Sequence, residues 1–436
     1  MERIKVIVVQ CHEEQLRSVS VPRGFLEIAL ETDAETVLEA TRDYFRHCWK
    51  AEVHALQWLF PEDFLLPNMH GETPYLVVFA KTLGQLPLVP VVPKDLGTSN
   101  GHTESAHAII RTAAESPCGA EPWSLPDWLP TTSHWIRRNL SSVRRIFQVR
   151  TCPNGAVLRI HCRDDAYYLK TQSSPLAYEW ALLKILNCRR PGSSPRVFDI
   201  RPDPNTHLTD AIRGRPIDSS DDMVALRRDA LGEVASLQVS SIRFVEELRD
   251  HGIPYHPLEF LGPRLEEKLN QVIDLQRESP NHLIPRELEN VTQLVRKTAR
   301  DFENLDRSKL PATLIHGDLN WSNAFQTETG GIALIDWSLS RVAHPFFTLS
   351  STVFASADGK CRIAAEYEAL CGAYLEVWSR FAPRSSLRAA LDAASRLFWI
   401  DSTIAIASLC RPGHVRNLIN LPRFLRAALR AYDLAS

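Results

Sequence analysis

The most informative stretch of this chain is residues 314–323, which read LIHGDLNWSN. It begins with apolar residues typical of a strand and continues into a polar loop. Within that loop, Asp318 precedes Asn323 by five positions, and a second apolar stretch further on ends at Asp336. The pattern predicts that one loop and the end of the next strand bring two carboxylates and one amide together.

These side-chain types suit the transfer of a phosphoryl group. A carboxylate such as Asp318 can orient an attacking hydroxyl group and accept its proton. The side-chain oxygens of Asn323 and Asp336 can hold Mg²⁺, because this ion prefers hard oxygen ligands and takes only one or two carboxylates from a protein. The bound ion neutralises charge on the phosphoryl oxygens. A polar loop without a metal is the alternative interpretation of the same residues.

The HGDxxxxN pattern of residues 316–323, followed by Asp336-Trp337 at a strand end, resembles the aminoglycoside phosphotransferase and choline kinase-like family, relatives of the protein kinases. The resemblance spans about residues 135–400. It implies that Asp318 is the catalytic residue and that Asn323 and Asp336 are the magnesium ligands. His316 would brace the loop.

Two charged residues upstream fit the part of this family that holds the nucleotide. The sequence predicts strands over 157–162 and 166–170, and a Ser-Ser-Pro start signal predicts a helix over 176–186. By the resemblance, Lys170 at the strand end pairs with Glu179 in the helix and positions the phosphates of ATP or GTP. Taken separately, each residue is better explained as a surface charge, and the order of the motifs favours the nucleotide role.

The link between the two lobes is expected just after these elements. Residues 207–214 fit that place, so that backbone groups of Leu208, Thr209 and Asp210 would contact the nucleotide base. An ordinary connection between a strand and a turn explains the same residues equally well.

Two positions depart from the family pattern. The turn that would cover the phosphates is often rich in glycine, but residues 151–155 contain only Gly155, which we expect to supply a positive φ. Thr348 stands where many members of the family have an aspartate that supports the catalytic loop. Neither position is among the groups assigned to the chemistry.

Composition limits the function classes that need to be considered. The 436 residues carry a net charge of −2, so no overall charge attracts the chain to nucleic acid or to an anionic membrane. The 9 cysteines show no CxxC spacing and no metal-ligand cluster, which favours reduced thiols. The apolar run at 4–9 is too short for a signal peptide, and charged residues interrupt the apolar stretch near the C-terminus. We therefore expect a cytoplasmic protein with no membrane or nucleic-acid partner.

The predicted fold class is α+β, with a two-lobed protein-kinase-like fold behind a small α/β module. The module spans 1–95 and has no assigned role, because it lacks the residue spacing of a Nudix hydrolase. A linker rich in glycine, serine and proline spans 96–130 and carries one short helix near 107–114. The β-rich N-lobe then spans 131–210, and the helical C-lobe with the catalytic loop spans 211–436.

The charged residues of the last helices have two interpretations. Glu366, Glu368, Asp392 and Asp401 are either solvated or placed to bind a cationic substrate. Several arginines make the tail basic, and we interpret them as solvated: Arg411, Arg416, Arg423, Arg426 and Arg430.

The predicted function is the Mg²⁺-dependent transfer of the γ-phosphoryl group of ATP or GTP to a hydroxyl group of a small substrate. One alternative is a pseudokinase that binds nucleotide for regulation, which the glycine-poor turn and Thr348 favour. Another is an adaptor that binds nucleic acid through its basic tail, for which salt-dependent binding is the test. The acceptor, the choice between ATP and GTP, and the oligomeric state are not determined by the sequence.

Overall fold

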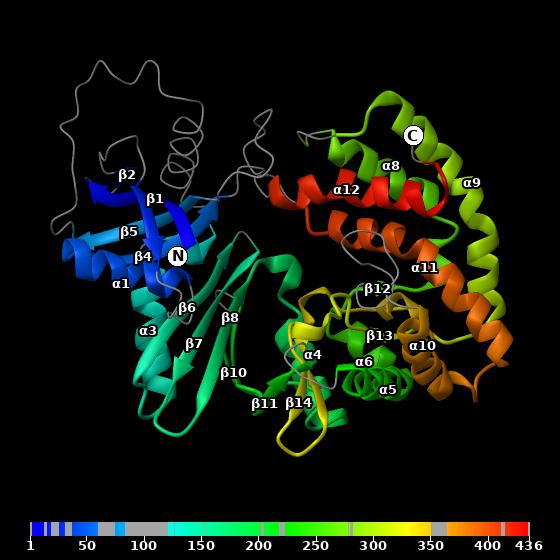
Figure 1. Cartoon of the computed structure of the whole chain (residues 1–436), viewed down its shortest axis with the longest axis horizontal. Helices are drawn as coiled ribbons and strands as arrows, with labels where there is room; N and C mark the ends of the chain where they lie inside the picture. Colours follow the sequence, from blue (N-terminus) through cyan, green and yellow to red (C-terminus); the bar gives the residue numbers. More distant parts are fainter. Residues whose placement is uncertain are drawn as a thin grey trace. The chain divides into compact units, whose positions relative to one another are not determined.

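The structure, a computed structural model, describes these ranges: 2–12, 15–18, 26–30, 37–59, 75–82, 121–125, 127–152, 154–201, 205–217, 223–277, 279, 282–349, 364–410 and 415–434. Contacts between residues divide the chain into two compact units (Figure 1). Unit 1 comprises residues 1–174 and 198–210, and unit 2 comprises residues 175–197 and 211–436.

Unit 1 begins with a five-stranded sheet in which β1 is central. The order is β2-β1-β5-β4, and β3 also pairs with β1. β1 runs parallel to β5 and antiparallel to β2 and β3. The elements are β1 (Glu2–His12), β2 (Gln15–Ser18), β3 (Leu26–Leu30), α1 (Val37–Trp49), β4 (Glu52–Leu59) and β5 (Tyr75–Thr82).

The second sheet of unit 1 has the order β6-β7-β8-β10-β9. Along β7 every second residue is buried, as expected for a strand with one face on a core. Those residues pack with Trp128 and Ile136 of helix α3 and with Leu208 of β10. The elements are η4 (Pro122–Ser124), α3 (Trp128–Asn139), β6 (Arg145–Cys152), β7 (Gly155–His161), β8 (Ala166–Gln172), β9 (Val197–Arg201) and β10 (Thr206–Asp210).

Helix α1 joins the two sheets of unit 1 at the edge strand β6. The carboxylate of Glu39 is 2% exposed and accepts a hydrogen bond from the backbone N–H of Gln148 at 3.2 Å. Arg42 and Arg145 form ion pairs with the same carboxylate. The contact covers backbone groups of an edge strand that would otherwise be open to pairing with another chain.

Unit 2 holds two small sheets that carry the candidate site. One has the order β11-β14-β15 and the other β12-β16-β13. Their strands are β11 (Gly214–Pro216), β12 (Tyr255–His256), β13 (Thr313–Ile315), β14 (Ala324–Thr327), β15 (Ile332–Leu334) and β16 (Arg341–Ala343).

Helices make up most of unit 2 and enclose one large apolar core. Helix α10 packs on α5, and α8, α9, α11 and α12 pack on one another (Figure 1). The α-helices are α4 (Glu179–Arg189), α5 (Met223–Ser241), α6 (Val245–Asp250), α7 (Leu258–Leu261), α8 (Leu265–Gln276), α9 (Pro285–Arg307), α10 (Ala364–Trp378), α11 (Arg384–Ala407) and α12 (Val415–Ala431). Short 3-10 helices are η5 (Ser174–Leu176), η7 (Ile242–Phe244), η8 (Trp321–Asn323), η9 (Trp337–Leu339) and η10 (Pro345–Leu349).

Most predicted elements are present, with one corrected boundary. The helix expected over 176–186 begins only at Glu179, because the Ser-Ser-Pro signal starts the separate turn η5 instead. The linker helix near 107–114 lies outside the described residues. The three predicted boundaries between the four segments stay a prediction. Within the described ranges, no helix has both the length and the apolar character needed to cross a membrane.

Candidate active site

His316 fixes the start of the catalytic loop, residues 316–323, directly after the buried strand β13. Its backbone N–H donates to Oγ1 of Thr348 at 3.2 Å, and its carbonyl accepts from Oγ of Ser340 at 3.1 Å. Its Nε2 lies 2.9 Å from the carbonyl oxygen of Ile335, so that nitrogen carries the proton and donates. The ring also packs on Trp337. His316 therefore ties the loop to the segment that carries Asp336.

Gly317 is required by a close approach of backbone. Its φ is +80°, a region that favours glycine, and a Cβ atom there would overlap the carbonyl oxygen of Leu339. Arg341 donates from Nη1 to the same carbonyl at 3.2 Å. The next residue, Asp318, is thus placed by a turn that leaves no room for a side chain.

Asn323, at the end of the loop, forms hydrogen bonds with Asp318 near its start. Its Nδ2 donates to the carbonyl oxygen of Asp318 at 2.9 Å and lies 3.5 Å from the Oδ2 atom of the same residue. The backbone N–H of Asn323 donates to the side chain of Asn320 at 3.1 Å. Because the amide nitrogen faces Asp318, the amide oxygen Oδ1 points away from that carbonyl.

Asp336 reaches the same place through the β14–β15 hairpin. Ala324 pairs with Leu334, and the backbone N–H of Ile335 donates to the carbonyl oxygen of Asn323 at 2.9 Å. Asp336 follows with φ 60° and ψ 63°, a left-handed conformation that aspartate tolerates better than most residues. Oγ of Ser338 donates to its Oδ1 at 2.8 Å. Asp318, Asn323 and Asp336 therefore belong to one connected cluster.

The start of helix α4 supports this cluster. Glu179 is 2% exposed, and its Oε1 accepts from the backbone N–H of Trp337 at 3.0 Å. The hydroxyl of Tyr178 donates to the carbonyl oxygens of Ser338 at 2.6 Å and Ser340 at 3.0 Å. Burial raises the pKa of Tyr178, so the phenol stays protonated and able to donate. Glu179 thus fixes the residue that follows Asp336.

The other predicted nucleotide residues lie in unit 1. Lys170 is in β8 and pairs with His207 of β10. Leu208, Thr209 and Asp210 end β10, which lies between β8 and β9 in the sheet. Strands on both sides use the backbone groups of a central strand. Leu208 and Asp210 both pair with residues of β8. The contact of Leu208, Thr209 and Asp210 with a nucleotide base therefore stays a prediction, as does the pairing of Lys170 with Glu179.

The glycine of the covering turn is explained differently from our expectation. Gly155 is not among the residues with positive φ, and it pairs with Cys152 across the β6–β7 turn. A Cβ atom at Gly155 would overlap the backbone carbonyl of Thr171 in the neighbouring strand. Sheet packing, and not a left-handed turn, requires glycine here.

The residues present fit a magnesium ion. A carboxylate at Asp336 and an amide oxygen at Asn323 are hard ligands of the kind that Mg²⁺ takes, with water and phosphate filling its other positions. Groups of three or more His, Cys, Asp or Glu residues that could hold a metal ion are absent from the described ranges, so this site would offer only two protein ligands.

Asp401 has a role that neither sequence interpretation included. It is 1% exposed and forms a buried ion pair with Arg341, the residue that contacts the Leu339 carbonyl beside Gly317. It is therefore neither solvated nor free to bind a cationic substrate. Glu368 and Asp392 are held by Arg388 instead. Only the three-dimensional pairing of α11 with β16 identifies this support, since nothing in the local sequence marks it.

Comparison with known proteins agrees with the motif. A sequence model described as the phosphotransferase enzyme family (APH) matches residues 144–384. No curated protein matches the chain. Similar solved structures include a macrolide 2'-phosphotransferase from Brachybacterium faecium, with 17% identity, a TM-score of 0.47, and coverage of 67% of this chain and 97% of the other. A choline kinase from Streptococcus pneumoniae has 12% identity, a TM-score of 0.46, and coverage of 69% and 99%.

The family match includes Lys170, Glu179 and the whole cluster of Asp318, Asn323 and Asp336. It spans more than half of the 436 residues, so it confirms both the resemblance seen in the sequence and the kinase-like α+β fold class. The chain belongs to the phosphotransferase enzyme family.

Proposed function

We propose that this phosphotransferase is a Mg²⁺-dependent kinase that transfers the γ-phosphoryl group of ATP or GTP to a hydroxyl group of a small molecule. The observation that carries the proposal is a pair of hydrogen bonds at Asn323: its side chain donates to the carbonyl of Asp318, and its own carbonyl accepts from the N–H of Ile335, the neighbour of Asp336. These bonds support a site in which one carboxylate orients the acceptor and two oxygen ligands hold the metal, as phosphoryl transfer requires.

In this proposal Asp318 orients the acceptor hydroxyl and takes its proton as the oxygen attacks the γ-phosphorus. The bond from that phosphorus to the β–γ bridging oxygen breaks, and the nucleoside diphosphate leaves. Asn323 and Asp336 hold Mg²⁺, which would neutralise charge on the phosphate oxygens. Lys170 contributes a cation for the phosphates, and Glu179 fixes the backbone beside Asp336. Backbone groups of Leu208, Thr209 and Asp210 at the end of β10 contact the base.

The pseudokinase alternative depended on two departures, and each has a structural explanation that leaves the site intact. Thr348 provides its hydroxyl oxygen as an acceptor for the N–H of His316, which is a contact an aspartate could also make. Gly155 is required by strand packing, because a Cβ atom there would overlap the carbonyl of Thr171. We therefore retain the pseudokinase only as the outcome in which no turnover is found.

The test is release of nucleoside diphosphate with Mg²⁺, ATP or GTP, and a panel of hydroxyl compounds. Asp318→Asn should lower kcat about 10²- to 10⁴-fold, the range that a positioned general base contributes, without loss of nucleotide affinity. Asp306→Asn is a matched control, because Asp306 pairs with Lys309 on the surface of unit 2 and lies outside the cluster. Nucleotide binding without turnover across the panel would identify a pseudokinase.

A further inference from the structure

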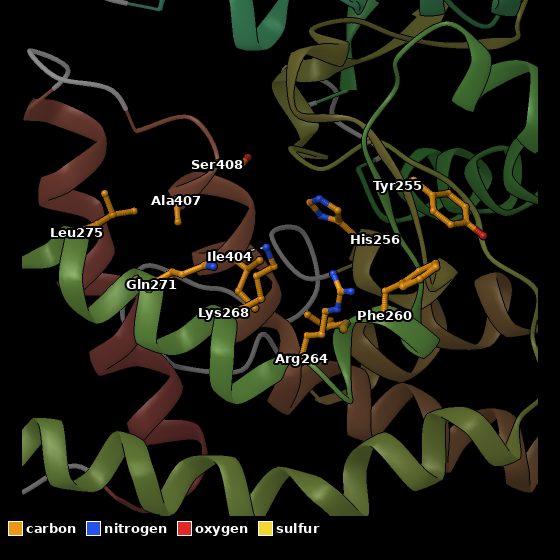
Figure 2. Close-up of a pocket in the computed structure, with 12 residues that line it drawn as sticks. Tyr255, His256, Phe260, Arg264, Lys268, Gln271, Leu275, Ile404, Ala407 and Ser408 are labelled. Atoms are coloured by element: carbon orange, nitrogen blue, oxygen red, sulfur yellow. Dashed lines mark hydrogen bonds between the residues drawn. The ribbon is translucent and has the colours of Figure 1, made fainter.

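A cavity of about 480 Å³ lies within unit 2, between β12, helices α7 and α8, and helix α11 (Figure 2). Its volume falls within the range of about 300–1,000 Å³ typical of small-molecule sites. We call it the basic pocket. Its apolar wall includes Leu261, Val272 and Ile404. Phe260 also lines it while remaining 52% exposed, so a large apolar ring is available to a ligand.

The polar wall of the basic pocket is positively charged. Arg264, Lys268, Gln271 and Leu275 follow helical spacing, which places them on one side of α8, and all line the cavity. Figure 2 shows the side chains of Arg264, Lys268 and His256 extending into the same space. The lining contains no aspartate or glutamate among the described residues.

The two permanent cations of the pocket are not neutralised by ion pairs. Neither Arg264 nor Lys268 pairs with a carboxylate in the described part of the chain, and Lys268 has only a 3.4 Å contact with Oε1 of Gln271. On α11, Asp401 precedes Ile404 by one turn, but the buried guanidinium of Arg341 already neutralises it. The pocket therefore keeps uncompensated positive charge beside apolar surface.

His256 adds a polar ring to the lining of the pocket. Its Nδ1 is buried and makes no hydrogen bond to any described residue. Burial lowers the pKa of His256, and the cations Arg341 and Lys268 lower it further, against the opposing effect of Asp401. At neutral pH the ring is therefore uncharged and can accept from or donate to a bound molecule.

The pocket and the catalytic loop share one sheet. His256 of β12 pairs with Ala343 of β16, and Ala343 pairs with Thr313 of β13. Strand β13 continues directly into the loop that carries Asp318. A molecule held against β12 is therefore held by the same rigid element that positions the catalytic loop.

We propose that the basic pocket binds the phosphoryl acceptor and that this acceptor is a hydroxylated organic anion, with an apolar body and a carboxylate or phosphate group. This inference rests on the proposed kinase function. Arg264 and Lys268 receive the anionic group, and Phe260 with Ile404 covers the apolar body. The class differs from the cationic acceptor that the acidic residues of the last helices had left open.

Binding to the Asp318→Asn variant tests the pocket without depending on turnover. The probes share one hydroxymethylphenyl body: 4-(hydroxymethyl)benzoate, its neutral amide, the cationic 4-(hydroxymethyl)benzylamine, and 4-(hydroxymethyl)phenylphosphonate. In titration calorimetry we expect a carboxylate or phosphonate probe to bind about tenfold tighter than the amide, as one added charge-assisted hydrogen bond gives. The tighter of the two anions identifies which group the pocket takes.

Substitutions of the two cationic residues test whether they cause the preference for anionic probes. Arg264→Gln and Lys268→Gln should each weaken binding of the anion about tenfold and leave binding of the amide within about twofold. Arg264→Lys, which keeps the charge, should retain most of the affinity. Arg277→Gln is the matched control, because Arg277 follows α8, pairs with Asp274 at the surface and does not line the pocket. Equal binding of anion and amide, or no loss in either glutamine variant, would overturn the inference.

Turnover by the unmodified chain with Mg²⁺-ATP separates this inference from the proposed function. Phosphorylation of an anionic probe with the lowest KM supports both. Turnover of the amide or the amine in preference to both anions overturns the inference and leaves the kinase function standing. Charge-dependent binding of anions without turnover of any acceptor overturns the kinase function and the acceptor role, while anion binding itself stands.

Discussion

At the scale of single residues, the catalytic loop is held by hydrogen bonds to its first residue. His316 is fixed at its N–H, its carbonyl and its ring, and these contacts reach Thr348, Ser340 and Ile335. A threonine replaces the aspartate that we expected from the family pattern, yet its hydroxyl oxygen supplies the acceptor. The support survives because an N–H group requires only an oxygen lone pair in the right place.

Thr348→Val should therefore lower both stability and activity. The change keeps the shape but leaves the buried N–H of His316 without this acceptor, which costs about 1–3 kcal/mol. We expect a lower urea midpoint and at least a severalfold lower kcat, with both restored in Thr348→Ser. Thr313→Val is the matched control, because the buried hydroxyl of Thr313 has no hydrogen-bond partner among the described residues. A kcat unchanged by Thr348→Val would contradict this role for the hydroxyl.

His344 should make stability depend on pH. Burial lowers the pKa of His344 to about 3, so the folded protein does not protonate it in the range where an unfolded histidine takes up a proton. Below about pH 6.5 the unfolded state therefore gains a proton, and the free energy of unfolding falls by about 1.4 kcal/mol per pH unit from this group.

The variant His344→Asn keeps an acceptor for the N–H of Phe346, which donates to Nδ1 of His344 at 3.3 Å. We expect the free energy of unfolding, measured with urea from pH 7 to pH 5, to fall less in His344→Asn than in the original chain. The comparison uses the slope with pH, so a difference in stability at pH 7 does not affect it. Parallel curves would show that His344 does not resist protonation in the folded state.

At the scale of elements, the helices of unit 2 are joined by a few buried or partly buried charge pairs. Glu287 near the start of α9 accepts from the backbone N–H of Ile284 at 2.9 Å and from Arg426 of α12 at 2.7 Å. In the same way, Arg396 of α11 pairs with Asp301 of α9. Arg426, counted in the sequence as part of a solvated basic tail, therefore joins two helices.

Glu287→Gln should separate the helix cap from the pairing of helices. Glutamine can still accept from Ile284, as in a capping box, but it loses the charge that faces Arg426. We expect a loss of about 1 kcal/mol in the free energy of unfolding at pH 7, because the pair is only partly exposed. Glu289→Gln, at an exposed position of the same helix, should change it by less than about 0.5 kcal/mol. Equal losses in the two variants would contradict a specific role for Arg426.

At the scale of the whole molecule, helix α1 contacts the second sheet within unit 1. Residues 1–174 belong to this unit, and the carboxylate of Glu39 of α1 accepts a hydrogen bond from the backbone N–H of Gln148 in β6. Burial raises the pKa of Glu39, against the opposing charge of Arg42, so this carboxylate is held where ionisation is costly. Here the buried carboxylate of Glu39 caps a backbone N–H group of the edge strand β6.

Glu39→Ala should destabilise unit 1 and expose its edge strand. We expect a loss of about 1–3 kcal/mol from the removed hydrogen bond and ion pairs, with faster proteolysis of the N-terminal residues. Arg46→Ala, further along α1 and paired with Asp43 at the surface, should cost less than about 1 kcal/mol. Similar losses from the two changes would show that Glu39 is only one surface charge among others.

Ligand binding should stabilise the folded chain in a metal-dependent way. A non-hydrolysable ATP analogue with Mg²⁺ at about 100 times its Kd should add about 2.7 kcal/mol and raise Tm, and EDTA should reverse most of that rise. In Asp336→Asn, the nucleotide analogue should still give the part of the Tm rise that EDTA does not reverse. The part that depends on Mg²⁺ should be lost. Full retention of the metal-dependent shift in Asp336→Asn would exclude Asp336 as a ligand.

Local sequence was sufficient to locate a loop or a strand wherever the residues that define it lie within one short stretch of the chain. The HGDxxxxN pattern located the catalytic loop, and the strands predicted over 157–162 and 166–170 are present as β7 and β8, because steric and hydrogen-bonding rules act between neighbours in sequence. The sequence signals for the first and last residues of helices were less certain, because α4 begins at Glu179 and not at residue 176 as predicted. A serine-proline cap can begin a short turn as readily as a helix.

The partners of those residues were decided only by tertiary structure. The sequence by itself determined that Asp318, Asn323 and Asp336 are present in the order and spacing of a phosphotransferase. It did not determine that Thr348 and Ser340 hold His316, that Asp401 neutralises Arg341, or that α8 presents two cations to a cavity beside β12. Those contacts join residues far apart along the chain, and their energies depend on which buried groups meet, which no local pattern records.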